Sequence, residues 1–82
     1  MLHKNYDRHY AVNQIDAEVE RIKEECQYGY SRQDQLLVDA AEVQILLGND
    51  EAAFELLDKC SAGLFLVATW RTACEETNMI VK

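Results

Sequence analysis

The chain has 82 residues, enough for one small domain and too few for two pieces that each bury a core. Its 49% hydrophobic and 28% charged residues are typical of a globular protein and exclude a disordered one. Fifteen acidic residues against eight basic ones give a net charge of −7, which disfavours unaided binding to nucleic acid or to an anionic membrane. No proline and only three glycines disfavour folds with many short strands, so we expect an all-helical bundle of three to four helices.

Three features of the sequence bear on where the protein works. The longest stretch without a charge, 60–70, is too short to cross a bilayer. The first ten residues lack the apolar stretch of a signal peptide. The three cysteines are odd in number and scattered, which predicts reduced thiols. We therefore expect a cytoplasmic protein.

The N-terminal segment is the least decided part of the chain. Leu2, Tyr6 and Tyr10 recur at four-residue steps, so one or two helical turns are possible there. We predict an N-terminal arm over 1–11 that orders only where its tyrosines find a surface, followed by a single helical domain over 12–82.

The first predicted helix runs over 13–28. Asn13 can cap its start, and Gly29 favours a stop because glycine tolerates the left-handed conformation at a helix end. One narrow apolar stripe alternates by three and four residues: Val12, Ile15, Val19, Ile22 and Cys26.

The second predicted helix runs over 31–47. Ser31 and Asp34 have the spacing of a capping box. We expect the inward face to consist of Leu36, Ala40, Val43 and Leu47, widened by Leu37, Ala41 and Ile45. Val38 and Leu46 fall outside this face, so the helix is apolar over more than half its circumference.

A third helix is expected over 51–60 and a fourth over 64–77. The short link at Gly48, with Asn49 or Asp50 as the next cap, requires the second and third helices to form an antiparallel hairpin. The expected inward residues of the third helix are Ala53, Leu56, Leu57 and Cys60, with Phe54 on the flank. Those of the fourth are Leu64, Val67, Ala68, Arg71 and Cys74, with Phe65, Leu66 and Trp70 beside them. Asn78 is a plausible stop, followed by an apolar tail of Met79, Ile80 and Val81.

The segment 37–60 resembles a single tetratricopeptide-type helix hairpin. The residues at matching offsets are Leu37, Ala41, Gly48, Ala53, Leu57 and Cys60. The small residues allow two helix backbones to approach, and the glycine closes the turn. The segment departs from that family at Gln44, where an aromatic residue is usual, and by having no proline at the end of the repeat. The resemblance implies a scaffold that grips another polypeptide.

The residues that usually carry chemistry form no convincing site. The soft metal ligands are His3, His9, Cys26, Cys60 and Cys74, and none of them forms a Cys-x-x-Cys pair. The three cysteines fall on the predicted inward faces, which favours buried thiols over ligands. No glycine-rich phosphate loop or serine elbow motif is present. We expect no enzyme activity, no metal, no cofactor and no small-molecule substrate.

Acidic residues dominate the middle of the chain, where 34–58 holds seven acids and no base. The acids at helical spacing form a predicted acidic face of Asp39, Glu42, Glu51, Glu55 and Asp58. Unpaired like charges at this spacing repel weakly. They are either ordinary solubility residues or a docking face for a basic partner.

The sequence also holds more large apolar side chains than a bundle of this length can bury. We predict that the surplus marks a partner-binding surface of Val38, Leu46, Phe65, Leu66 and Trp70. Core packing is the alternative for Trp70. The predicted function is a small acidic adaptor or chaperone that binds a helical segment of a protein partner or self-associates. The alternative is a phage-type inhibitor that mimics nucleic acid and occupies a basic groove.

Overall fold

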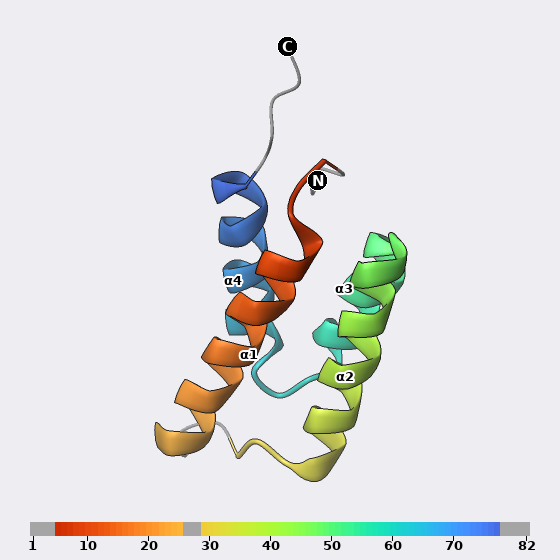
Figure 1. Cartoon of the computed structure of the whole chain (residues 1–82). Coiled ribbons are helices and arrows are strands. Elements are labelled where there is room, and N and C mark those ends of the chain that lie inside the picture. Colours follow the sequence, from red (N-terminus) through yellow and green to blue (C-terminus); the bar gives the residue numbers. More distant parts are fainter. Residues whose placement is uncertain (1–4, 26–28, 78–82) are drawn as a thin grey trace.

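The computed structural model describes residues 5–25 and 29–77, which form four α-helices and contain no strand. The helices are α1 (Arg8–Glu25), α2 (Arg32–Leu47), α3 (Asp50–Asp58) and α4 (Gly63–Glu76). α1 lies beside α4, α2 lies beside α3, and the two pairs pack against each other (Figure 1). The predicted all-helical fold is therefore confirmed.

Helix α1 begins at Arg8, five residues before the predicted start at Asn13. The reason is that Asp7 caps the helix: its Oδ1 accepts a hydrogen bond from the backbone N–H of Tyr10 at 3.0 Å. Tyr6 and Ala11 lie in the hydrophobic core. The described part of the predicted arm is thus part of the helical body, and a start at residue 13 is wrong.

The apolar stripe of α1 faces inward as predicted. Ile15, Val19 and Ile22 are buried, and Val12 is half-buried against the same core. Cys26 and the predicted end of the helix at residue 28 lie outside the described residues, as do Leu2, Asn78 and the apolar tail.

Both ends of α2 follow the prediction. Ser31 and Asp34 form a complete capping box, with the Asp34 N–H donating to Ser31 Oγ at 3.2 Å and the Ser31 N–H donating to Asp34 Oδ2 at 2.9 Å. Gly48 ends the helix in the left-handed conformation at φ 92°. A residue with a Cβ would be strained there, so the tight turn into α3 depends on this glycine.

The prediction of which face of α2 packs inward is wrong for its main row: Leu36, Ala40, Val43 and Leu47 are exposed. Only the residues predicted to widen that face lie inward, with Ala41 and Ile45 buried and Leu37 half-buried. The other buried residues of the helix are Asp34 and Val38. Two apolar stripes run along this helix, so periodicity alone did not choose between them. Tertiary contacts decide the choice, because Asp34 reaches Ser61 in the turn before α4 and fixes the inward side of the helix.

A similar shift occurs in α4, where Cys74 is buried as predicted but the rest of the predicted inward row is not. Leu66, Trp70, Ala73 and Cys74 are buried, while Leu64 is 84% exposed, Val67 is half-buried, and Ala68 and Arg71 are exposed. Gly63 provides the physical reason, since a Cβ on this residue would lie 2.2 Å from the Leu57 carbonyl oxygen. The start of α4 therefore approaches α3 closely, and residues three and seven positions after Gly63 share its buried side.

Helix α3 follows its prediction closely. Ala53, Leu57 and Cys60 are buried, Leu56 is half-buried, and Phe54 is 42% exposed on the flank. In the two ranges that the structure describes, no helix is both long enough and apolar enough to cross a membrane.

Candidate functional site

The predicted partner-binding residues do not form one surface. Val38, Leu66 and Trp70 are completely buried in the core, so they are not available to a partner in this fold. Leu46 on α2 and Phe65 on α4 are 44% and 43% exposed. The prediction of a partner-binding surface is therefore wrong for Val38 and Leu66, and for Trp70 the alternative of core packing is confirmed.

A different set of residues forms a continuous apolar surface. We call it the α2 stripe, and it consists of Leu36, Ala40, Val43 and Leu47. The exposed fractions of Leu36, Val43 and Leu47 are 63%, 53% and 68%. The stripe lies on the side of α2 opposite to its buried residues, and its spacing of four, three and four residues is that of a coiled-coil seam. The sequence shows this spacing, and the prediction that these four residues face the core is wrong.

A largely buried polar cluster joins Tyr6 and the start of α1 to α2, α3 and α4, and we call it the clasp. Arg8 Nη1 donates to Asp50 Oδ1 at 2.6 Å and to the Ile45 carbonyl at 2.8 Å. The Tyr6 hydroxyl donates to Asp50 Oδ1 at 3.0 Å and accepts from Trp70 Nε1 at 3.1 Å. The Arg8 guanidinium also lies 4.5 Å from the centre of the Tyr6 ring.

The polar groups of the clasp are bonded to one another, so none of them is placed to act as a general acid or base. Burial is the main cause that raises the pKa of Tyr6, so its phenol stays protonated. The hydrogen bond with Asp50 is the main cause that raises the pKa of Arg8, so its guanidinium stays charged. We conclude that the clasp is structural and joins all four helices.

A second polar cluster surrounds Asp34 at the opposite end of α2. Ser61 donates to its carboxylate from both the backbone N–H, at 3.1 Å, and the hydroxyl, at 2.7 Å, and Ser31 donates in the same way. Burial alone would raise the pKa of Asp34, but these hydrogen bonds outweigh it and lower the pKa to about 2. The carboxylate therefore links the start of α2 to the turn between α3 and α4.

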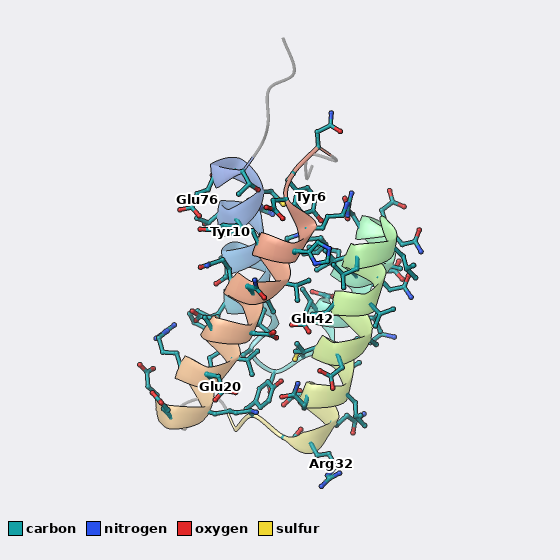
Figure 2. The ribbon with its side chains drawn as sticks, viewed as in Figure 1. Tyr6, Tyr10, Glu20, Arg32, Glu42 and Glu76 are labelled. Atoms are coloured by element: carbon teal, nitrogen blue, oxygen red, sulfur yellow. The ribbon has the colours of Figure 1, made fainter. Side chains whose placement is uncertain are left out.

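Glu42 does not belong to the acidic face on which it was predicted. Its side chain lies between α1 and α2 (Figure 2), and its Oε2 is buried with no hydrogen-bond partner among the described residues. Burial is the main cause that raises its pKa to about 9, followed by the hydrogen bond with Asp16 and the charges of Asp16 and Asp39. Glu42 is therefore protonated at neutral pH and adds no charge to the surface.

We expect Glu42→Gln to stabilise the protein above about pH 5. In the unfolded chain Glu42 ionises near its ordinary pKa of 4.5, whereas in the fold it holds its proton up to about pH 9. The wild type therefore loses stability as the pH rises between these two values, and the neutral amide does not. Measured by urea unfolding at about pH 8, the free energy of unfolding of the variant should exceed that of the wild type by about 1 kcal/mol or more. At about pH 4 the two values should be almost equal.

The control for this comparison is Glu55→Gln, which removes an exposed acid from α3. Its unfolding free energy should follow that of the wild type across the same pH range. If the unfolding free energy of Glu42→Gln also equals that of the wild type at every pH, the conclusion that Glu42 is buried and protonated is wrong.

The other four predicted acidic residues, Asp39, Glu51, Glu55 and Asp58, are exposed. Asp39 lies on α2 and accepts a hydrogen bond from Gln35 Nε2 at 2.9 Å. The remaining three share one side of α3 at helical spacing. The acidic face is therefore smaller than predicted and is confined mainly to α3.

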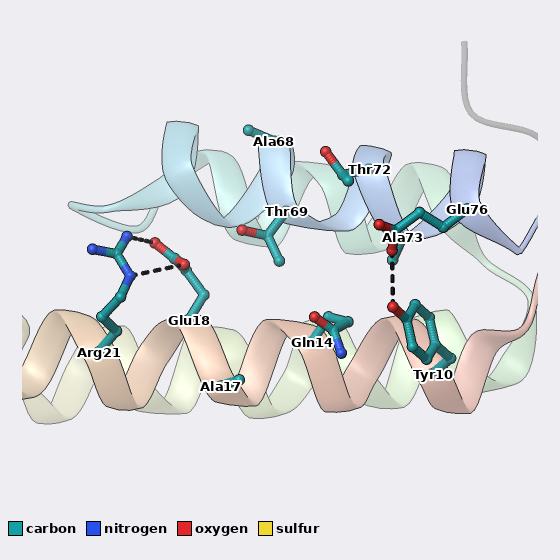
Figure 3. A pocket seen from close by; sticks show the side chains of 10 residues that line it. All are labelled: Tyr10, Gln14, Ala17, Glu18, Arg21, Ala68, Thr69, Thr72, Ala73 and Glu76. Carbon is teal, nitrogen blue, oxygen red and sulfur yellow. Dashed lines mark hydrogen bonds and ion pairs between the residues drawn. The ribbon is translucent and has the colours of Figure 1, made fainter.

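A shallow groove of about 420 Å³ runs between α1 and α4 (Figure 3). Tyr10 closes one end, with its hydroxyl donating to Glu76 Oε1 at 2.8 Å, and Glu18 pairs with Arg21 towards the other end. The residues that line it are Tyr10, Gln14, Ala17, Glu18, Arg21, Ala68, Thr69, Thr72, Ala73 and Glu76. None of these is a cysteine, histidine or serine, so the groove does not combine a strong nucleophile with a base.

The cysteines that the structure describes behave as buried thiols. Cys60 and Cys74 are free and buried, and burial is the main cause that raises the pKa of each to about 11. His9 is exposed on α1, while His3 and Cys26 lie outside the described residues. Over 5–25 and 29–77, no three histidine, cysteine or acidic side chains come together as a metal site would require.

The α2 stripe is therefore the strongest candidate functional site. Comparison with known proteins adds no family to this assignment: the chain matches no model of a protein family, no curated protein and no solved structure.

Proposed function

We propose that the protein is a helix-docking module, a small adaptor or chaperone that binds one amphipathic helix along the α2 stripe. The observation that carries this proposal is the orientation of Leu36, Val43 and Leu47, which face solvent at the spacing of a coiled-coil seam. A monomer gains no stability from large apolar side chains that remain in water. A partner helix that covered them would remove that apolar area from water.

The surroundings of the stripe also favour a helix as the bound element. Helix α2 has 16 residues, so it is about 24 Å long and presents a straight edge of roughly four turns. Ala40 in the middle of the stripe has a small side chain, which lets a second backbone approach. The capping box and Gly48 hold both ends of α2 without any partner, so the surface is formed before binding.

The tetratricopeptide-like character of the α2–α3 hairpin is part of this proposal. Ala41 and Ala53 are buried at the positions where such hairpins place small residues, and Gly48 closes the turn. We place the module in the cytosol, where the reduced state of Cys60 and Cys74 would persist.

The exposed acids of α3 favour a second candidate, an acidic decoy for a basic groove. Glu51, Glu55 and Asp58 lie on one side of the helix, and no ion pair involves them within the described part of the chain. Binding of this kind would depend on charge and would weaken steeply with salt, unlike binding through an apolar stripe.

A designed peptide tests the proposed function. The probe is a monomeric amphipathic helix with leucine at every a and d position and a neutral polar face, carrying a fluorophore for anisotropy titration. The wild-type chain should bind it, and Val43→Glu should weaken binding about tenfold or more because it puts a charge in the seam. Leu64→Glu is the matched control, since Leu64 is 84% exposed on α4 and lies outside the stripe.

Salt and charge variants separate the two candidates. For docking on the α2 stripe, affinity should change little between about 50 mM and about 500 mM salt. A binding loss in Glu55→Gln that matched the loss in Val43→Glu would favour the acidic decoy. No measurable binding by the wild type would argue against a helix-docking module.

A further inference from the structure

We propose that the helix bound by the α2 stripe is α2 of a second copy, arranged antiparallel in a weak homodimer. This inference rests on the proposed function and names its partner. It follows from the order of residues along the stripe, from the charges beside it and from the charges at its two ends.

The stripe is self-complementary when two copies run in opposite directions. Leu36 and Leu47 lie at equal distances on either side of its midpoint, and so do Ala40 and Val43. An antiparallel pair therefore stacks four apolar layers, with leucine against leucine at both ends and alanine against valine in the middle. A parallel pair would instead place Ala40 against Ala40. Two alanines leave a gap between the Leu36 layer on one side and the Val43 layer on the other.

The charges beside the stripe favour a second copy over a basic helix. The exposed residues next to it are Gln33, Asp39 and Leu46, and Gln44 is half-buried. Glu42 is turned towards α1 and is protonated, so Asp39 is the single charge along this edge between the two terminal leucines. A basic partner would gain little electrostatic attraction here, whereas a second copy needs none.

The charges at the ends of the stripe complement each other in the antiparallel arrangement. Arg32 is exposed at the start of α2, and Glu51 is exposed just after the turn at its end. Each Arg32 therefore approaches the end of the partner helix where Glu51 stands and where the helix dipole is negative. A parallel pair would bring both copies of Arg32 to the same end.

The size and charge of the protein set the strength and salt dependence of this dimer. One helix of four turns from each copy makes an interface below the size of permanent complexes, so we expect a dissociation constant in the micromolar range or weaker. Each copy carries a formal net charge of −7 from its sequence and remains acidic with Glu42 protonated, so the copies repel each other at low salt. Added salt screens this repulsion and should strengthen the dimer, whereas it would weaken binding of a basic partner.

Sedimentation equilibrium of the full chain tests the dimer. Between about 10 µM and about 1 mM protein in about 500 mM salt, the mass should rise from 9.4 kDa towards twice that value. Val43→Glu should remain at the mass of one chain, while Leu64→Glu should associate like the wild type. Far-ultraviolet circular dichroism should show both exposed-site variants to be as helical as the wild type.

Charge reversal tests the antiparallel order. Arg32→Glu should weaken association several-fold, because it places two acids at each end, and the double variant Arg32→Glu with Glu51→Arg should restore it. A wild type that stays monomeric at about 1 mM, or a Val43→Glu variant that associates normally, overturns the dimer. Failure of the double variant to restore association overturns the antiparallel order.

The proposed function and this inference fail in different ways. A monomeric wild type that still binds the designed peptide through Val43 overturns the homodimer and supports docking of another protein's helix. A wild type that neither associates nor binds the peptide overturns both.

Discussion

Asp50→Ala should lower the free energy of unfolding by about 3 kcal/mol or more. The substitution removes the carboxylate that accepts hydrogen bonds from Arg8 and Tyr6 and breaks the ion pair between Arg8 and Asp50 in a largely buried position. A domain of this size is stabilised by only about 5–15 kcal/mol, so the loss should be visible as a large drop in the urea midpoint followed by circular dichroism.

Glu51→Ala is the matched control for this prediction. Glu51 also lies in the first turn of α3, so both substitutions remove one acid that interacts favourably with the helix dipole. Glu51 is exposed, whereas the Asp50 carboxylate lies in the clasp, so the control should change stability by only about 0.5 kcal/mol. Equal losses in the two variants would show that the clasp adds nothing beyond the dipole.

Trp70→Ala should destabilise the fold by about 3–5 kcal/mol. Trp70 is completely buried at the centre of α4, and its indole N–H donates to the Tyr6 hydroxyl at 3.1 Å. Removal of the indole leaves a large cavity and takes one donor from the clasp. Urea unfolding followed by circular dichroism measures the loss. In the wild type, the fluorescence of Trp70 should have the short emission wavelength of a buried indole, and this emission should shift to longer wavelength on unfolding.

Phe65→Ala provides the comparison within the same helix. Phe65 is 43% exposed, so its removal should cost about 1 kcal/mol or less and should leave the chain folded. A small effect of Trp70→Ala, or an exposed tryptophan emission spectrum in the native protein, would contradict the placement of Trp70 in the core.

Several elements of the fold were predictable because local sequence determines them. The capping box at Ser31 and the left-handed Gly48 involve residues within a few positions of each other, and both occur as predicted. The stripe of α1 was predictable for a similar reason: it is the single apolar stripe of a helix whose other sides are polar, so only one inward face exists. The start of α1 was missed because the capping residue Asp7 lies in a segment whose ordering depends on contacts with distant residues.

The candidate site depended on tertiary structure. Helices α2 and α4 are apolar on more than one side, so hydrophobic periodicity permits two orientations for each. Long-range contacts select one of them: Asp34 binds Ser61, Gly63 approaches the Leu57 carbonyl, and the Trp70 indole donates to Tyr6. The composition and the helical pattern are enough to show that the chain has more large apolar side chains than one bundle of this size buries. Only these contacts decided that Trp70 lies inside and that the α2 stripe faces solvent, because a contact between residues far apart in the chain leaves no local pattern.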